Sequence, residues 1–185
     1  MTLPKGFKAD AERTAARIRT EMGVGAADPL QMKALVEHHD IRLVSAETLV
    51  DMARLEELER IQAYAFSAAT FDINGGKVIV TNPLRSPGRL ASDVAHELSH
   101  VLLDHELAEV REIEGVPFRT CRPAEEEQAT HLGGTILLPR PLLLAAARRG
   151  LGPEQIASEV GVTTEMARFR YNTTGVARQL RHRGA

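Results

Sequence analysis

The sequence predicts an α+β protein in which a small antiparallel or mixed sheet packs against one central helix. Three features support this class. The clearest strand, 77–82, is rich in Val and Ile, and the helix start Ser86-Pro87 follows it closely. Near the end, Gly161 separates two short helical segments in the outline of a helix-turn-helix. We therefore expect two units, a compact α+β domain over 1–140 and a helical extension over 141–185 packed on it.

The composition is that of an ordinary globular protein. The 185 residues are 43% hydrophobic, with a formal net charge of -2. No apolar run approaches the ~20 residues needed to cross a bilayer, and the N-terminus leads into a charged segment instead of a signal core. A single cysteine, Cys121, excludes an internal disulfide framework and fits a reducing cytoplasm. We expect a cytoplasmic protein without membrane contact.

The N-terminal third is expected to contain two helices and a strand. Residues 7–22 carry apolar side chains near the 3.6 period, and Gly23 ends that segment. Asp28-Pro29 combines an N-cap residue with proline at the first helical position, which predicts a second helix to about residue 38. A short strand is expected at 41–44, whereas 47–60 fits either a helix or an extended, charged connection.

The rest of the chain predicts a hairpin and then mostly helices. Residues 61–71 alternate loosely, and 72–76 have the chemistry of a hairpin turn. We expect strand 77–82 to be a candidate edge of the sheet. Further along, the expected segments are a loop over 105–122 and helices over 123–138, 141–149, 153–160 and 164–172.

The central helix carries the motif His96-Glu97-Leu98-Ser99-His100. Histidines four residues apart share a helical face, about 6 Å apart along the axis, which suits two imidazoles binding one metal ion. Glu97 beside them is placed to act on a metal-bound water. The apolar positions of the helix fall on nearly the opposite side: Leu90, Val94, Leu98 and Val101. The helix must therefore pack on both sides if the histidines are to meet a second element.

A metal site of this kind needs a third ligand from elsewhere in the chain. Catalytic zinc usually takes three protein ligands and leaves one position to water, whereas structural sites are closed by four ligands, mostly cysteines. With one cysteine, a closed cysteine-rich site is ruled out. The candidates are the acids between Asp104 and Glu127, together with His105 and His131.

The helix that begins at Pro123 narrows this choice without deciding it. Its apolar arc consists of Ala129, Leu132 and Ile136. Glu126 shares a stripe with Thr130 and Gly133, whose small size lets a second helix approach closely. Glu125 lies nearer to the centre of the apolar arc, so periodicity alone leaves both acids open.

At this point the chain resembles the ImmA/IrrE metallo-endopeptidases. The likeness lies in the motif from His96 to His100, in Glu126 and Ala129, and in the helix end Leu137-Leu138-Pro139. It extends over most of the chain and includes Arg89, Ala95 and the segment Val162-Thr163…Arg170…Gly175. Departures from the family pattern are Ser92 and Asp93, where Phe and Thr are usual, and Leu132-Gly133 in place of Phe-Ala.

The resemblance implies a zincin-like fold and a Zn²⁺ ion held by His96, His100 and Glu126. It also implies that Glu97 takes a proton from the attacking water and passes it to the leaving amine. A side chain that stabilises the oxyanion is not identified; the hydrogen-bond donors available are Tyr171, His131 and His105.

The resemblance further implies a protein substrate, namely a helix-turn-helix transcriptional repressor whose cleavage starts a stress or mobile-element response. An extended segment of that substrate would add along strand 77–82. Asp93, three residues before His96, is a candidate hydrogen-bond partner of that ligand, although an exposed helix acid is the simpler interpretation.

Other interpretations remain open. The protein could bind a repressor without cutting it, or the metal could be structural. From Arg140 onward there are eight arginines and three glutamates, which permits DNA contact by the C-terminal helices. No aromatic-basic pattern supports base contact, so we do not expect direct nucleic-acid binding. Cys121 lies five residues before Glu126, which raises the hypothesis of a redox switch; an inert thiol is the simpler interpretation.

Overall fold

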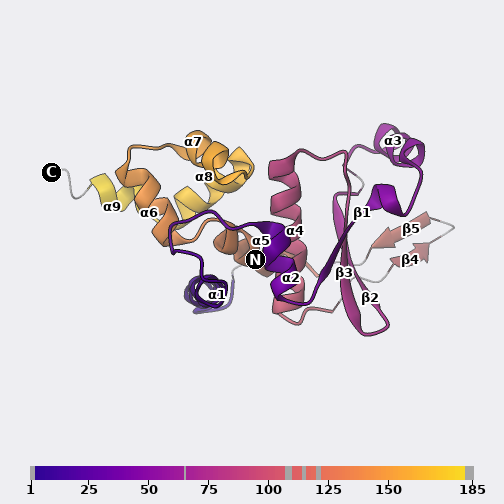
Figure 1. Cartoon of the computed structure of the whole chain (residues 1–185), viewed down its shortest axis with the longest axis horizontal. Coiled ribbons are helices and arrows are strands. Elements are labelled where there is room, and N and C mark those ends of the chain that lie inside the picture. Colours follow the sequence, from indigo (N-terminus) through magenta and orange to yellow (C-terminus); the bar gives the residue numbers. More distant parts are fainter. Residues whose placement is uncertain (1–2, 65, 107–109, 114–115, 120–121, 182–185) are drawn as a thin grey trace.

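The computed structural model describes residues 3–64, 66–106, 110–113, 116–119 and 122–181, and its mixed content of helices and strands confirms the α+β class (Figure 1). In chain order, the elements are α1 (Phe7–Glu21), α2 (Met32–His38), β1 (Arg42–Ser45), the 3-10 turn η1 (Ala46–Thr48), α3 (Met52–Ile61), β2 (Ala68–Ile73), β3 (Gly76–Thr81), α4 (Pro87–Leu102), β4 (Val110–Ile113), β5 (Val116–Arg119), α5 (Pro123–Leu137), α6 (Arg140–Arg148), α7 (Pro153–Val160), α8 (Thr164–Thr173) and α9 (Val176–Arg181).

The main sheet has the order β1-β3-β2, with β3 parallel to β1 and antiparallel to β2. The prediction that strand 77–82 forms an edge is therefore wrong, because β3 is the central strand. Its run Val78, Ile79 and Val80 is buried throughout, as expected of a strand covered on both faces. Asn74 and Gly75, with φ of 55° and 80°, make the tight turn that places β2 beside it. The edge strands of this sheet are β1 and β2.

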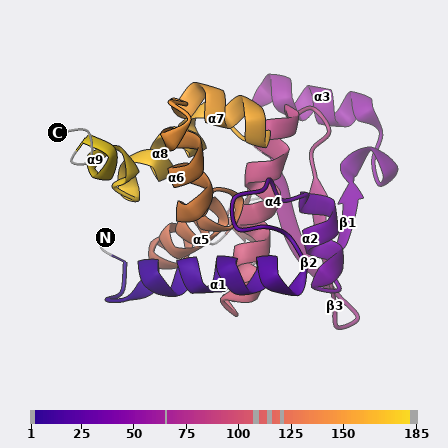
Figure 2. The same cartoon turned by 60° about the vertical axis from the view of Figure 1, so that its left-hand side comes forward.

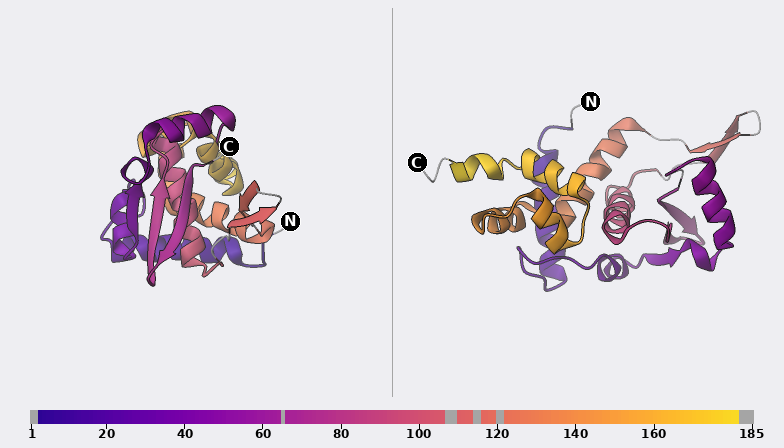
Figure 3. Two further views of the ribbon diagram at one scale, coloured as in Figure 1. Left: turned by 90° about the vertical axis from the view of Figure 1, so that its right-hand side faces the viewer. Right: turned by 90° about the horizontal axis from the view of Figure 1, so that it is seen from above.

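The predicted loop over 105–122 contains a hairpin. Strands β4 and β5 pair antiparallel, from Val110 opposite Arg119 to Ile113 opposite Val116. Strands of four residues are too short to show a sustained period, and proline is tolerated where one side of a strand has no partner. Seen from above, this hairpin projects from the end of the molecule opposite to the C-terminus (Figure 3, right).

The predicted start of the second helix at Asp28-Pro29 is also wrong, because α2 begins at Met32. The Arg19 guanidinium donates to the carbonyl oxygens of Gly25 (3.3 Å) and Asp28 (2.6 Å) and thereby holds the connection against α1. The ambiguous segment 47–60 is mainly helical, and Asp51 caps α3 by accepting a hydrogen bond from Ala53 N at 2.9 Å.

Helix α4 lies at the centre of the fold, between the sheet on one side and the C-terminal helices on the other (Figure 1). Its Val94 and Leu98 belong to one core with Ile79 of β3 and Leu132 and Ile136 of α5. Helix α1 runs along the base of the molecule and closes this core (Figure 2). Helix α4 thus packs against the sheet on one side and against α5 on the other.

A second apolar core joins the C-terminal helices to the end of α5. It includes Leu138, Leu143, Ile156 and Ala167. Gly161 adopts φ 74° in the turn between α7 and α8, which the sequence predicts. The division into units at residue 140 stays a prediction. Within the described part of the chain, no helix is long and apolar enough to cross a membrane.

Candidate metal centre

Helices α4 and α5 bring three potential metal ligands together. The Nε2 atom of His96 lies 3.1 Å from Nε2 of His100 and 3.1 Å from Oε2 of Glu126. His100 Nε2 lies 3.6 Å from Oε1 of the same carboxylate. Two zinc ligands at bond lengths near 2 Å and tetrahedral angles stand about 3.3 Å apart. The spacing of these three side chains therefore suits a single tetrahedral ion.

The remaining ring nitrogens have partners outside the cluster. His96 Nδ1 lies 3.4 Å from the Thr130 hydroxyl, and His100 Nδ1 lies 3.0 Å from Nδ1 of His105. Nδ1–H groups that donate outward leave the Nε2 lone pairs of neutral rings directed at each other and at the carboxylate of Glu126. Such lone pairs repel unless a cation or a proton lies between them. This donor set fits a bound divalent metal.

Glu126, not Glu125, is the acid that reaches the imidazoles, and the small-residue stripe explains how. A Cβ atom on Gly133 would lie 2.8 Å from the carbonyl oxygen of Ala95, so α4 and α5 can approach this closely only with glycine there. Glu125 instead pairs with Arg122 at 3.1 Å. When a proton instead of a cation lies in these gaps, hydrogen bonding to His100, and then to His96, holds the pKa of Glu126 well below its usual range. The carboxylate is therefore ionised at neutral pH.

Glu97 lies beside this cluster on the side of α4 that faces the sheet. Its side chain is buried, with 4% exposure, and its Oε2 accepts a 2.7 Å hydrogen bond from the Thr70 hydroxyl. Thr70 is on the edge strand β2, where its side chain shares the buried face with Ala68. The sequence alone does not predict this contact, because it depends on how β2 pairs and packs.

A chain of hydrogen bonds supports His100 from behind. When His100 Nδ1–H donates to His105 Nδ1, the Nε2–H of His105 donates to Oε1 of Gln128 at 3.3 Å. His105, a candidate ligand from the sequence, therefore contacts a ligand instead of joining the cluster. The predicted contact of Asp93 with His96 is not found: Asp93 accepts hydrogen bonds from Ser67 and Arg89.

Comparison with known proteins shows which family the chain belongs to. The family model described as the IrrE N-terminal-like domain, a peptidase family, matches residues 36–172. The chain belongs to this family. The match includes both histidines, Glu97 and Glu126, and it confirms the resemblance to ImmA/IrrE proteins.

Among solved structures, the chain is similar to a Mycobacterium tuberculosis transcriptional regulator, with a TM-score of 0.53 and 19% sequence identity. The similarity covers 89% of this chain and 46% of that chain, so the protein spans about half the length of this neighbour. At this identity the likeness concerns the fold. No curated protein is significantly similar to the chain in sequence.

Three other residues were singled out in the sequence. Two of them lie away from the cluster of this IrrE-like domain, and one lies outside the described residues. His131 is buried between the rings of Phe7 and Phe169, with centroids 6.0 Å away on each side. Burial, aided by the charges of Arg170 and Lys8, lowers the pKa of His131 to about 4. Tyr171 packs against the second core. Cys121 lies outside the described residues, so the redox hypothesis stays a prediction.

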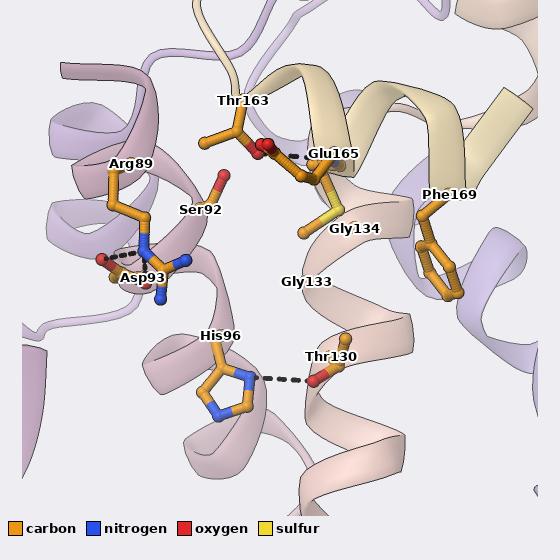
Figure 4. Close-up of a pocket in the computed structure, with 11 residues that line it drawn as sticks. Arg89, Ser92, Asp93, His96, Thr130, Gly133, Gly134, Thr163, Glu165 and Phe169 are labelled. Carbon is orange, nitrogen blue, oxygen red and sulfur yellow. Dashed lines mark hydrogen bonds and ion pairs between the residues drawn. The ribbon is translucent and has the colours of Figure 1, made fainter. Parts of the chain in front are cut away.

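A pocket of 380 Å³ opens beside His96, between α4, α5 and the first turns of α8 (Figure 4). Its wall on the α4 side includes Arg89 and Asp93, and its wall on the α8 side includes Glu165 and Phe169. The C-terminal helices thus help to form a cavity that begins at a candidate metal ligand. The sequence did not predict this role for them, because the packing of α8 on α5 joins segments far apart in the chain.

Proposed function

We propose that the protein is a zinc-dependent endopeptidase that cleaves a helix-turn-helix transcriptional repressor at one or a few bonds. The observation that carries the proposal is the convergence of His96, His100 and Glu126 beside the buried carboxylate of Glu97. Membership of a peptidase family supports the reaction class. The choice of a repressor as substrate, and of a stress or mobile-element response as the outcome, rests on the likeness to ImmA/IrrE enzymes.

Each side chain has a separate role in the proposed reaction. His96, His100 and Glu126 would hold the zinc ion, which lowers the pKa of a bound water towards ~7 and polarises the scissile carbonyl. Glu97 accepts the proton of the attacking water and passes it to the leaving amine. The Thr70 hydroxyl fixes the orientation of the Glu97 carboxylate.

The substrate would add to β2, which replaces the predicted strand 77–82 in this role. Strand β2 lies at the edge of the sheet and carries Thr70, so a segment that hydrogen-bonds to its backbone would pass close to Glu97. Main-chain pairing of this kind binds an extended peptide and leaves selectivity to side-chain pockets.

The C-terminal helices fit this proposal better than they fit DNA binding. Arg170 is buried, with 1% exposure, and Arg168 pairs with Glu154 at 2.5 Å. Glu165 and Phe169, near the start of α8, line the pocket beside His96. Arg170, Glu165 and Phe169 of the second helix are therefore directed at the core or at the pocket of the protein itself, and Arg168 is held in a surface ion pair, whereas a DNA-reading helix would present such side chains to the major groove.

Coexpression with each helix-turn-helix regulator encoded nearby tests the proposal, with new termini mapped by mass spectrometry. Glu97→Gln should lower the rate of cleavage by about 10²–10⁴-fold, because it removes the general base, while zinc content stays the same. Identical termini with wild type and Glu97→Gln would overturn the peptidase proposal. A regulator that binds but is never cut would favour the non-proteolytic alternative.

Two neighbouring acids provide a matched control for the ligand assignment. Glu126→Gln should lose zinc and activity, because a neutral amide is a weak zinc ligand. Glu125→Gln should retain both, since Glu125 pairs with Arg122 outside the cluster. The reverse result would assign the third ligand to Glu125.

A further inference from the structure

The pocket beside His96 ends at the acidic side chain of Glu165, which is exposed. Arg89 and Asp93 neutralise each other, because Arg89 Nε lies 2.9 Å and 3.0 Å from the two carboxylate oxygens. Within the described part of the chain, no lysine, arginine or histidine forms an ion pair with Glu165. Figure 4 shows Glu165 at the top of the pocket and His96 at its base. The pocket walls therefore carry one unbalanced negative charge.

That charge lies far from the candidate metal ligands. A Cβ atom on Gly88 would lie 2.9 Å from the carbonyl carbon of Val162, so the turn before α8 rests on the first turn of α4. Glu165, three residues beyond Val162, is therefore held near the N-terminal end of α4. Arg89 and His96 are seven residues apart, which is about 10 Å along the helix. Only a long side chain extends from the ligands to this end of the pocket.

The wall between the two ends is largely apolar. Gly133 and Gly134 present helix backbone without side chains, and Met166 lies directly over α5, because a Cβ atom on Gly134 would come within 2.7 Å of its sulfur. Phe169, with 37% exposure, lines the same cavity. An unbranched hydrocarbon stem would replace water along this wall, and an aromatic ring also favours a nearby cation.

The two ends also differ in the charge that they favour. A divalent cation held by two neutral imidazoles and one carboxylate leaves a net positive charge near His96, whereas Glu165 makes the far end negative. A cationic group is therefore disfavoured beside the ligands and favoured beside Glu165. A side chain with an apolar stem and a positive tip matches both ends.

We infer that this pocket binds the side chain of a lysine or arginine next to the scissile bond of the substrate. The inference rests on the proposed function, because it places the reacting bond at His96, His100 and Glu126. It makes Glu165 a specificity-determining residue and assigns the second helix of the helix-turn-helix to substrate selection. The preferred substrates are exposed protein segments with a basic residue beside the cleaved bond.

Three metal-binding probes of equal backbone test this preference: the hydroxamates of N-acetyl-lysine, N-acetyl-norleucine and N-acetyl-glutamate. Lysine and norleucine share the unbranched stem, so their difference isolates the charge. Isothermal titration of the zinc-loaded protein should show the lysine probe binding about fivefold tighter than norleucine, with glutamate weakest. Glu165→Gln should make lysine and norleucine equal, and Glu165→Lys should place glutamate first.

The matched control is Glu159→Lys, since Glu159 of α7 is an exposed acid that pairs with Arg149 and lies outside this pocket. It should leave the order of the probes unchanged. Equal binding of lysine and norleucine by the zinc-loaded wild type, or an order that survives Glu165→Lys, would overturn the specificity inference and leave the metal site standing. A wild-type protein that fails to bind zinc would overturn the proposed function and this inference with it.

Discussion

The two halves of α5 differ in burial and in the residues that they contact. The first half carries Glu126 and Thr130 and leaves them partly exposed beside the imidazoles. In the second half, every residue from 131 to 137 is buried. Two arginines from distant helices bind the carbonyl groups at its end: Arg19 donates to Ile136 O at 3.1 Å and Arg170 to Leu138 O at 3.1 Å. The first half of α5 thus supplies a candidate metal ligand, whereas the buried second half contributes to the stability of the fold.

This separation has a physical basis. A helix ends with carbonyl groups that lack partners and carry partial negative charge, so buried cations there both satisfy and stabilise it. Rigid packing of that end fixes the direction of the whole helix, and the ligand at the other end is positioned without being buried itself. Substitutions at the two ends should therefore have separable effects on the free energy of unfolding and on metal affinity.

The largest effect is expected at the scaffold end. Arg170→Met should lower the free energy of unfolding by about 3 kcal/mol, because it removes one partner of a buried ion pair and leaves Leu138 O unsatisfied. Glu12, the partner at 2.7 Å, keeps a hydrogen bond from Arg140 N, which limits the loss. Denaturation in urea measures the change, and the zinc affinity of the folded protein should stay within threefold.

Arg168→Met is the matched control, because Arg168 lies on the same helix but is exposed and pairs with Glu154 at the surface. Its cost should stay below about 1 kcal/mol. Similar losses for the two arginines would mean that the C-terminal end of α5 is not specially stabilised.

His131, at the boundary between the two halves, should make stability depend on pH. Its pKa is 6.5 as a free group and about 4 in the folded protein. Between these values the unfolded chain binds more protons, so the free energy of unfolding falls as the pH is lowered from 6.5 to 4. The contribution is fully present above pH 6.5 and amounts to about 3 kcal/mol. Urea denaturation of the metal-free protein across this range measures it.

His131→Gln should flatten that pH dependence, whereas His38→Gln should retain it, since His38 is a surface histidine near Glu21. A slope unchanged by His131→Gln would mean that other groups govern the acid sensitivity.

The difference between local sequence patterns and tertiary contacts explains which features could be predicted from the sequence. The two histidines on one face of α4 and the small-residue stripe of α5 follow from helical periodicity, which is local, and the structure brings His96, His100 and Glu126 together. Their role as metal ligands stays a prediction. The position of β3 at the centre of the sheet could not be predicted, because a buried apolar strand has the same sequence pattern whichever strands pair with it. The contacts of Thr70 with Glu97 and of Arg19 with Asp28 are set by tertiary packing, which no local pattern encodes.

The smallest effect is expected behind the ligand end, where His105 supports His100. His105→Ala should weaken zinc binding by about 10–100-fold, because His100 loses the acceptor that fixes its Nδ1–H outward. The free energy of unfolding of the metal-free protein should change by less than about 1 kcal/mol, since the side chain is only partly buried. Competition with a chromophoric chelator measures the affinity. His105→Gln, which keeps an acceptor, should restore part of it, and an affinity equal to wild type in His105→Ala would show that Thr130 and the helix packing alone orient the imidazoles.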